Sequence, residues 1–416
     1  MRTGARVAGR VLAAIAGALL AGVAILWAHG VTTSGNAAPG TSSRPSESDT
    51  SGSNQPRAGN EPVDGARSPR LATTGPQVLL AWSQGLPPDA ETRLEAVPGV
   101  SDATTVRAGL DWVAYSKDAD GGVIDRPPDG YAIPMEVAVV EPAEYSRFVP
   151  PGERSAILAL RRGHMLLSDT SAELRRGGTG LRLRMRDRVT TVSGVLSDIA
   201  ANGYEGIMAG ATPPSWQRVE TFVLAHIKRR ARARVARAAR DMLPAGQVAR
   251  IRIEGETPFL RYGDAVLPQL LVKKNFGEFS AQPQSDGTLR IDPRWVRENI
   301  RSERVPVLGE VTCHRNVFPQ MRRALGEAQA TGAAYAINKD QFGGCFGPRF
   351  ISRDPTGRIS HHAWGIAFDL NVAENPVGSK PNLNQGLVHV IEKWGFTWGG
   401  RWLIPDGMHF EWKRFN

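Results

Sequence analysis

The chain has 416 residues, of which 41% are hydrophobic and 22% are charged. This composition is typical of folded, soluble domains and excludes a chain that is disordered throughout. The length exceeds that of one ordinary core, so we expect two globular domains. A formal net charge of +10 at pH 7 would suit a polyanionic partner, but frequent use of arginine as a solubilising residue explains the charge as well.

The N-terminus has the pattern of a membrane anchor. Three arginines in the first ten residues precede an unbroken apolar run, Val11–Ala28. About 18 apolar residues are enough to cross a bilayer as a helix, and the positive flank stays inside. We therefore expect a cytoplasmic tail at 1–10 and a transmembrane signal anchor at 11–29. The alternative is a signal peptide cleaved near Asn36–Ala38. In both cases the rest of the chain is extracytoplasmic, and the first predicts a single-pass protein of the cell membrane.

The segment 30–75 is rich in Ser, Gly, Pro, Thr and Asn and contains almost no large apolar residues. It cannot bury enough surface to fold, so we expect a disordered linker. As a random coil it would reach several tens of ångströms, which is enough to hold a domain away from a membrane surface.

The region 76–244 is expected to be an α+β domain. Asp89–Ala96 follows two prolines and predicts a short helix. Met135–Val140 and Ile157–Leu160 are short apolar runs bounded by Pro and Gly, as in a domain of alternating strands, and Leu181–Arg186 alternates with period two, which predicts a strand with its arginines in water.

Three short segments of this domain, Leu94–Val100, Gly163–Ser168 and Val192–Val195, resemble the extracytoplasmic domain of MacB- and FtsX-type permeases. That resemblance implies an interaction or positioning module without catalytic residues. His164 lies in one of these segments and has no second ligand near it in sequence, so we expect a surface or packed histidine there.

The run His226–Arg240 is rich in alanine and arginine and predicts a helix with cations in most directions. Its simplest interpretation is a solvated amphipathic helix, and the alternative is contact with anionic lipid or cell-wall polymer. Pro244–Gly246 ends the helix, and we place the domain boundary there. The following lead-in, 245–304, should contain a strand at Val248–Ile253 and a short helix from Ile291, and it carries no recognisable chemistry.

The C-terminal region, 305–416, contains both cysteines of the chain, Cys313 and Cys345. In an oxidising compartment such a pair favours a disulfide, with free thiols as the alternative. The spacing of the apolar residues from Val317 to Ala328 predicts a helix, and Gly386–Lys393 predicts another, on which His389 should be exposed.

A Ser-x-His-x-x-Gly-x-Ala-x-Asp motif spans Ser360–Asp369, and an Asp-x-x-His motif ends the same region. We expect strands at Gly365–Asn371 and Met408–Trp412 whose pairing brings His362, Asp369 and His409 together. Two imidazoles and one carboxylate leave a fourth zinc position open for water, as in catalytic zinc sites.

The carboxylate of Asp406, three residues before His409, is placed to take a proton from that water. Two alternatives remain open at this point. His361 could replace its neighbour as a ligand in a register shifted by one residue. Glu411 follows His409 by two residues on the same strand face and could replace Asp406 as the base.

These two motifs closely resemble those of zinc D,D-carboxypeptidases of VanY type and of bacterial and phage L-alanyl-D-glutamate endopeptidases, over roughly Val305–Asn416. The resemblance implies Zn²⁺ on two histidines and an aspartate, Asp406 as general base, and an arginine that contacts substrate. Arg315 fits that position best, and Arg349 is the reserve. Asp406 stands where the carboxypeptidase branch has Glu, which favours an endopeptidase.

The predicted fold class is therefore α+β. We expect a membrane-anchored, two-domain protein in which an α+β extracytoplasmic domain precedes a small antiparallel-sheet zinc peptidase domain. Its expected partners are peptidoglycan stem peptides, the membrane and anionic wall polymers, and no nucleic acid. The competing hypothesis is a cell-wall-binding or permease-like accessory protein that holds peptide without cutting it.

Overall fold

The computed structural model describes residues 77–416 except 84 and 265–266, all of which belong to one compact unit, Gly65–Asn416. The predicted signal anchor at 11–29 and linker at 30–75 lie outside the described residues. Among the residues described, no helix is both long and apolar enough to cross a membrane.

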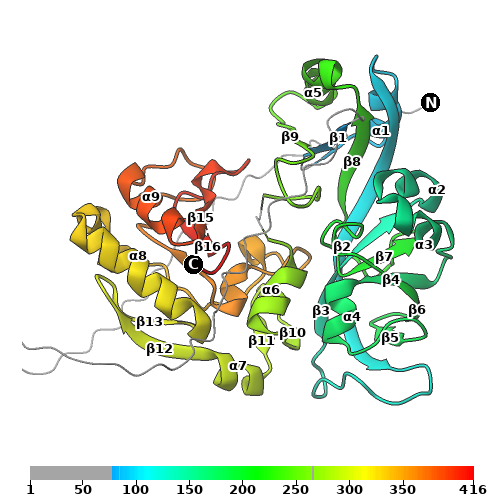
Figure 1. Ribbon diagram of the computed structural model, residues 1–416. Coiled ribbons are helices and arrows are strands. Elements are labelled where there is room, and N and C mark those ends of the chain that lie inside the picture. Colours follow the sequence, from blue (N-terminus) through cyan, green and yellow to red (C-terminus); the bar gives the residue numbers. More distant parts are fainter. Residues whose placement is uncertain (1–76, 84, 265–266) are drawn as a thin grey trace, which may run out of the picture. The chain divides into compact units, whose positions relative to one another are not determined.

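Six strands, one of which is the long strand β2, close into a barrel (Figure 1). Their order is β3-β7-β4-β6-β5-β2, and β2 pairs again with β3 to complete the ring. The β3–β7 and β4–β6 pairs are parallel, and the other pairs are antiparallel. The strands are β2 (Val100–Lys117), β3 (Ile133–Val140), β4 (His164–Ser168), β5 (Arg182–Met185), β6 (Val189–Leu196) and β7 (Gly206–Ala209).

Strand β2 extends beyond the barrel and continues the sheet through β8-β1-β9. These strands are β8 (Glu220–Ile227), β1 (Gln77–Trp82) and β9 (Arg250–Ile253). The lead-in predicted at 245–304 thus contributes β9 to the first sheet. Five α-helices pack around these strands: α1 (Ala90–Glu95), α2 (Pro142–Tyr145), α3 (Arg154–Leu158), α4 (Asp169–Leu174) and α5 (Arg232–Asp241).

Several local predictions for this region are confirmed. The expected helix at Asp89–Ala96 is α1, and the strand at Leu181–Arg186 is β5, in which Leu183 and Met185 are buried. The apolar run Met135–Val140 lies in β3, which is buried along its whole length. The prediction for Ile157–Leu160 was wrong, because its first two residues end helix α3.

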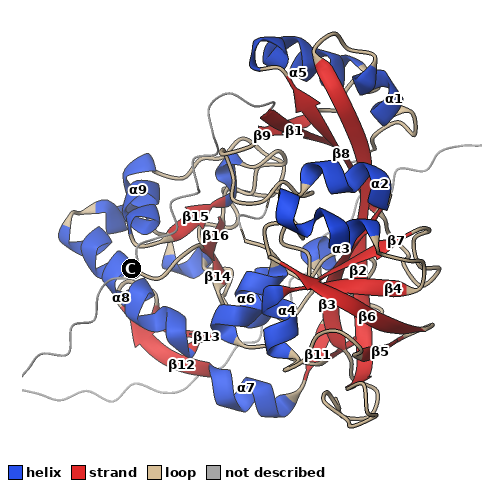
Figure 2. Ribbon diagram, turned by 45° about the vertical axis from the view of Figure 1, so that its right-hand side comes forward, coloured by secondary structure: helices blue, strands red, loops and turns tan. Residues whose placement is uncertain are grey.

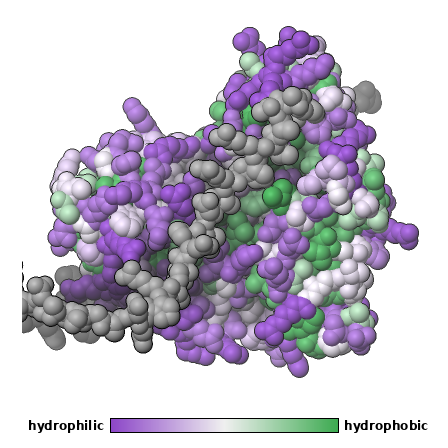
Figure 3. Space-filling model, in the orientation of Figure 1, coloured by the Kyte–Doolittle hydropathy of each residue, from purple (hydrophilic) through white to green (hydrophobic). Residues whose placement is uncertain are grey.

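The basic run folds differently from the prediction at its start. His226 is still in β8, and the helical part begins with a 3-10 turn at Arg229–Ala231 before α5. Val235, Ala236 and Ala239 are buried against the sheet extension, which confirms an amphipathic helix. Hydrophilic side chains gather at the end of the molecule where α5 lies (Figure 3).

The second half of the chain begins with α6 (Gln269–Phe276), the β10–β11 hairpin (Ala281–Pro283 and Leu289–Ile291) and α7 (Pro293–Asn299). The helix expected from Ile291 therefore starts two residues later, where Asp292 caps it by accepting a hydrogen bond from the Arg294 N–H. The hairpin β12–β13 (Ile300–Val305 and Gly309–His314) follows, and then α8 (Phe318–Ala330), the helix that the apolar spacing predicts.

A three-stranded antiparallel sheet of order β14-β16-β15 carries the two sequence motifs. Its strands are β14 (Ala367–Asp369), β15 (Phe396–Trp398) and β16 (His409–Trp412). Helix α9 (Gln385–Lys393) contacts α8, and α8 lies between α9 and the β12–β13 hairpin (Figure 2). His389 is exposed on α9, as expected.

Strand β14 is shorter than the predicted Gly365–Asn371, because Gly365 and Asn371 both have positive φ. The α+β fold class is borne out by these helices and mixed sheets. One hydrophobic cluster joins α6, the hairpins, α8, α9 and the three-stranded sheet, and it includes Trp112 of β2. The C-terminal elements therefore pack on the barrel through a continuous core.

Helix α6 is also tied to the barrel by a buried charge cluster. The Lys273 ammonium lies 2.6 Å from the Glu205 carboxylate and 2.8 Å from that of Glu278, and all three side chains are largely or fully buried. Arg175 pairs with the same Glu278 at 3.2 Å. Removing one partner from such a cluster leaves uncompensated charge in a medium of low dielectric constant.

We predict that Lys273→Ala lowers the free energy of unfolding by about 3–5 kcal/mol, because the buried Glu205 carboxylate loses the cation that it pairs with and Glu278 keeps only Arg175. Lys274→Ala is the matched control: its ammonium lies 3.6 Å from Glu173, and both side chains are more than half exposed, so little change is expected. Denaturation in urea measures both variants. A Lys273→Ala protein as stable as the Lys274→Ala protein would contradict the prediction.

His314 gives the fold a pH dependence. The ring is 1% exposed, its Nδ1 accepts the Asn316 N–H at 3.2 Å, and Nε2 donates to the Phe276 carbonyl at 3.1 Å. The contact at Nδ1 needs the neutral ring, because a protonated Nδ1 cannot accept a hydrogen bond, and burial lowers the pKa of His314 to about 4. The unfolded chain binds this proton near pH 6.5. Stability is therefore complete above pH 6.5 and is lost as the pH falls towards 4.

We predict that the titration of His314 lowers the free energy of unfolding of the wild-type protein by about 3 kcal/mol between pH 7 and pH 4. His314→Gln cannot titrate, so the stability difference between the two proteins should shrink by that amount over this range. Urea denaturation at a series of pH values measures the difference. A constant difference would rule out His314 as the source.

Candidate metal centre and active site

His362 is held by the turn that the first motif forms. The 3-10 turn His361–Trp364 begins at Ser360, whose hydroxyl accepts the His362 N–H at 3.4 Å. Gly365 ends the turn with φ of 66°, and a Cβ at this position would lie 2.7 Å from the backbone nitrogen of His314. Only glycine fits this close approach of two backbones. The turn leaves the His362 side chain 98% buried beside β14.

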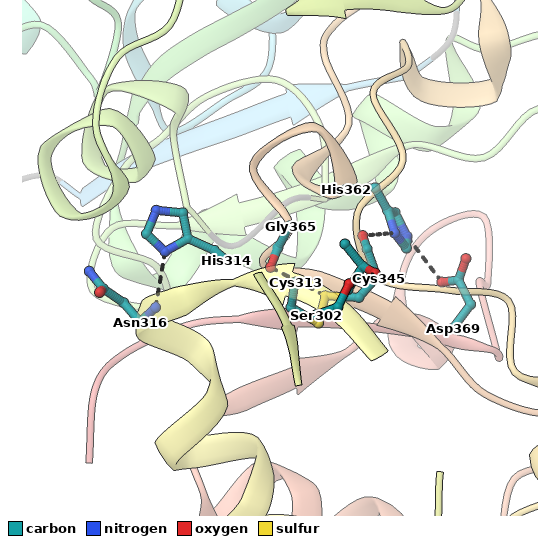
Figure 4. The surroundings of a disulfide bond; sticks show 9 residues. Ser302, Cys313, His314, Asn316, Cys345, His362, Gly365 and Asp369 are labelled. Carbon is teal, nitrogen blue, oxygen red and sulfur yellow. Dashed lines mark hydrogen bonds and ion pairs between the residues drawn. A yellow bond between two sulfur atoms is a disulfide. The ribbon is translucent and has the colours of Figure 1, made fainter. Parts of the chain in front are cut away.

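Asp369 and His409 are directly opposite each other in the antiparallel pair β14–β16. Opposite residues project from the same face of a sheet, so register alone brings their side chains together. His362 enters from the turn before β14, and the three side chains meet (Figure 4 shows His362 directed at Asp369).

The three donor atoms form a nearly equilateral triangle. His362 Nε2 lies 3.2 Å from Asp369 Oδ1 and 3.2 Å from His409 Nδ1, and His409 Nδ1 lies 3.0 Å from Asp369 Oδ1. A tetrahedral zinc ion with ligands at about 2.0–2.1 Å spaces them about 3.3 Å apart. The spacing and chemistry of the three side chains therefore fit a metal ion.

The second nitrogen of His362 contacts the Cys345 carbonyl oxygen at 2.9 Å. This contact holds the proton on Nδ1 and leaves the Nε2 lone pair for a ligand. Burial lowers the pKa of His362, which favours the same neutral ring. Cys345 is bonded to Cys313, so the predicted disulfide is confirmed, and it anchors the carbonyl that orients His362 (Figure 4).

Glu411 lies behind the triangle. Its carboxylate is 2.8 Å from His361 Nδ1 and 3.5 Å from His409 Nε2. Burial opposes protonation of His409, but the hydrogen bonds with Asp369 and Glu411 outweigh it and raise the pKa of His409 to about 10. The carboxylates on both sides of this ring favour a cation at the centre, either a proton or a metal ion.

These contacts bear on the two alternatives left open by the sequence. Glu411 is paired with two imidazoles, which outweigh its burial and hold its pKa far below the usual range, so it is a poor proton acceptor. His361 pairs with Glu411, whereas the cluster that could hold a metal ion contains His362. The geometry favours His362 as ligand and leaves Asp406 as the candidate base.

Asp406 lies in the loop before β16, where its carbonyl accepts the His409 N–H at 3.2 Å. Burial, together with the nearby Asp369 and Glu411 carboxylates, raises the pKa of Asp406 despite the opposing charges of His409 and Arg349. Its Oδ1 is buried without a hydrogen-bond partner among the described residues. A carboxylate in this state is a better proton acceptor near neutral pH than an exposed aspartate.

The two candidate arginines lie in different places. Arg315 is exposed in the 3-10 turn before α8 and does not line the cavity at the metal cluster. Arg349 lines that cavity, with its guanidinium 3.6 Å from Asp369 Oδ2. The structure therefore places the reserve residue at the site and the first choice outside it.

The cluster opens into a cavity of about 470 Å³. One wall comes from the three-stranded sheet and its loops, including Trp402, whose ring centre is 5.2 Å from that of His409. The other wall comes from the first sheet and the lead-in, including Trp82 of β1, Glu220 of β8 and Tyr262. The sequence did not predict that these three residues line the cavity, since no motif or spacing links them to the metal cluster.

Ion pairs join the two walls. Arg358, just before the first motif, pairs with Glu220 of β8 at 3.0 Å, and both side chains are mostly buried. Arg218 pairs with Asp354 at 2.8 Å nearer the surface. The cavity is therefore enclosed by two parts of the chain that are far apart in sequence.

Residues 353–412 match a family model described as D-alanyl-D-alanine carboxypeptidase. The match includes the metal-cluster residues His362, Asp369 and His409 as well as Asp406, and it supports a peptidase. No curated protein matches the chain. The resemblance of the middle domain to MacB- and FtsX-type permeases has no support from these comparisons.

We predict that Asp369→Ala weakens zinc binding by at least about 100-fold, because one of three ligands is lost and the two imidazoles lose the carboxylate that stabilises a cation between them. His389→Ala, at the exposed position on α9, is the control and should bind as the wild type does. Calorimetric titration of the metal-free proteins with Zn²⁺ measures both. Equal affinities in the two variants would show that the ion binds elsewhere.

Proposed function

We propose that the protein is a zinc-dependent peptidase that hydrolyses peptide bonds in the stem peptides of peptidoglycan outside the cytoplasm. The observation that carries the proposal is the close triangle of His362, Asp369 and His409 beside the Asp406 carboxylate, whose Oδ1 is buried and whose pKa is raised. The family match over residues 353–412 points to the same substrate class.

Each residue has a distinct role in this proposal. His362, Asp369 and His409 would hold zinc, which when bound polarises a substrate carbonyl and makes water a better nucleophile at neutral pH. Asp406 accepts a proton from the attacking water and delivers it to the leaving amine. Arg349 faces the same cavity and stabilises negative charge on the substrate oxygen in the role that the sequence assigned to Arg315.

The N-terminal segment supplies the proposed location. An anchor at 11–29 and a linker at 30–75 would place the catalytic unit outside the membrane, within reach of the cell wall. Anionic wall polymers are proposed as a secondary contact for the exposed arginines of α5.

The bond that is cut distinguishes two branches of the proposal. The family description favours a D,D-carboxypeptidase, whereas Asp406 in place of Glu favours an L-alanyl-D-glutamate type endopeptidase. Only the carboxypeptidase releases free D-alanine. Product analysis on muropeptides of defined sequence separates the two.

We predict that Asp406→Asn lowers kcat on stem peptides by about 10²–10⁴-fold while zinc content stays unchanged, because the amide cannot accept the proton. Asp340→Asn, an exposed position outside the cavity, should retain wild-type activity. Muropeptide hydrolysis and metal analysis of the full-length protein test this. Zinc-loaded wild-type protein that binds stem peptides but cuts none would instead favour the accessory binding protein.

A further inference from the structure

The loop that carries Asp406 is fixed at its ends by hydrogen bonds within the C-terminal region, 305–416. This base loop, 399–406, starts with the 3-10 turn Gly399–Arg401, and the Asp406 N–H closes the loop on the Gly399 carbonyl at 3.0 Å. Near its second end, the Pro405 carbonyl accepts the Gly378 N–H at 2.7 Å. The middle of the loop lies against other parts of the chain.

Leu403, in the middle of the base loop, is bound through its backbone by the lead-in. Its N–H donates to Asp264 Oδ2 at 2.6 Å. The other oxygen of Asp264 accepts from Arg250 at 2.8 Å and from Arg252 at 3.4 Å, and both arginines lie on β9. The Asp264 side chain is 11% exposed, so these charge-assisted contacts are mostly shielded from water.

The side chain of Leu403 makes the second contact. It packs against the hydrophobic cluster formed by the barrel and the lead-in, to which Leu80, Phe222 and Tyr262 belong. Arg250 also donates to the Arg401 carbonyl at 3.3 Å. The Asp264 and Arg250 side chains therefore bind the backbone of the base loop at Leu403 and Arg401, and the hydrophobic cluster packs against the Leu403 side chain.

The polar side chains that hold the middle of the base loop all lie outside the segment that matches the family model. The match covers 353–412, whereas Arg250, Arg252 and Asp264 precede it by about ninety residues or more. The ends of the base loop are bonded to residues of the C-terminal region, and its middle is bonded to Asp264 and Arg250. The position of the Asp406 carboxylate therefore depends on both sets of contacts.

We propose that Asp264 and Leu403 are positioning residues, through which the barrel and lead-in hold the base loop in its catalytic geometry. This inference rests on the proposed function, in which Asp406 is the base. The lead-in and the first sheet are then part of the catalytic apparatus. A proton acceptor displaced by about 1 Å can cost about 10²-fold in rate.

Two variants break the contact from opposite sides. Asp264→Ala removes the acceptor of the Leu403 N–H, and Leu403→Ala removes the apolar contact. In full-length protein, each should lower kcat on stem peptides about 10- to 100-fold, with KM within about threefold, because substrate binding does not need the base in place. Leu403→Met preserves volume and should restore activity to within about threefold of wild type.

Hydrogen–deuterium exchange gives a readout that does not depend on activity. Asp264→Ala should speed exchange of the 401–406 amides at least about tenfold, since the Leu403 N–H loses its acceptor. Asp264→Asn keeps an acceptor oxygen and should have a smaller effect. The control is Asp102→Ala, which removes a barrel ion pair with Arg147 away from the cavity and should change neither exchange nor kcat.

The outcomes separate this inference from the proposed function. Faster exchange with unchanged kcat in Asp264→Ala would overturn the positioning role. Unchanged exchange would show that the anchor does not hold the loop. A wild-type protein that cuts no stem peptide would refute the proposed function, while the exchange of the 401–406 amides would still report whether the first sheet holds the base loop.

Discussion

The geometry of the site depends on one constraint: two imidazoles and a carboxylate are buried within 3.2 Å of one another. Buried carboxylates on both sides of His409 are stable together only if a cation lies between them, and this explains why the same ring has a strongly raised pKa. The hydrogen bond from His362 to the Cys345 carbonyl and the pairing of Glu411 with His361 orient the side chains around that cation.

The extension of the first sheet and the lead-in form the wall of the cavity opposite this small sheet. β14, β15 and β16 have three or four residues each, too few to enclose a cavity by themselves. Glu220, Tyr262 and Trp82 close the opposite side, and the buried Arg358–Glu220 pair holds the motif-bearing loop against β8. A peptide that reaches the metal cluster therefore lies between two parts of the chain, so the first domain can influence which peptides enter.

Local patterns predicted local features well. The run that begins at Asp89 forms α1, the alternating residues around Leu183 form β5, and Cys313 and Cys345 form the expected disulfide. The errors occurred where local pattern and tertiary context differ. A short apolar run such as Ile157–Leu160 fits a buried strand or a buried helix equally well, and it is partly helical here. Strand β14 is shorter than predicted because Gly365 and Asn371 adopt positive φ in the turns that flank it. Periodicity cannot separate such cases in short segments.

The sequence by itself indicated the set of candidate metal ligands, because metal binding requires specific side chains and a period of two places Asp369 on the same strand face as the small side chain of Ala367. It did not determine which arginine lies at the site. Arg315 and Arg349 each follow one of the two cysteines by a few residues, and only the path of the chain around Cys313–Cys345 brings Arg349 to Asp369. The closing wall and the anchor of the base loop were likewise decided by tertiary structure, since Asp264 and Leu403 meet across 139 residues of sequence. Contacts of that range leave no periodic trace in the sequence.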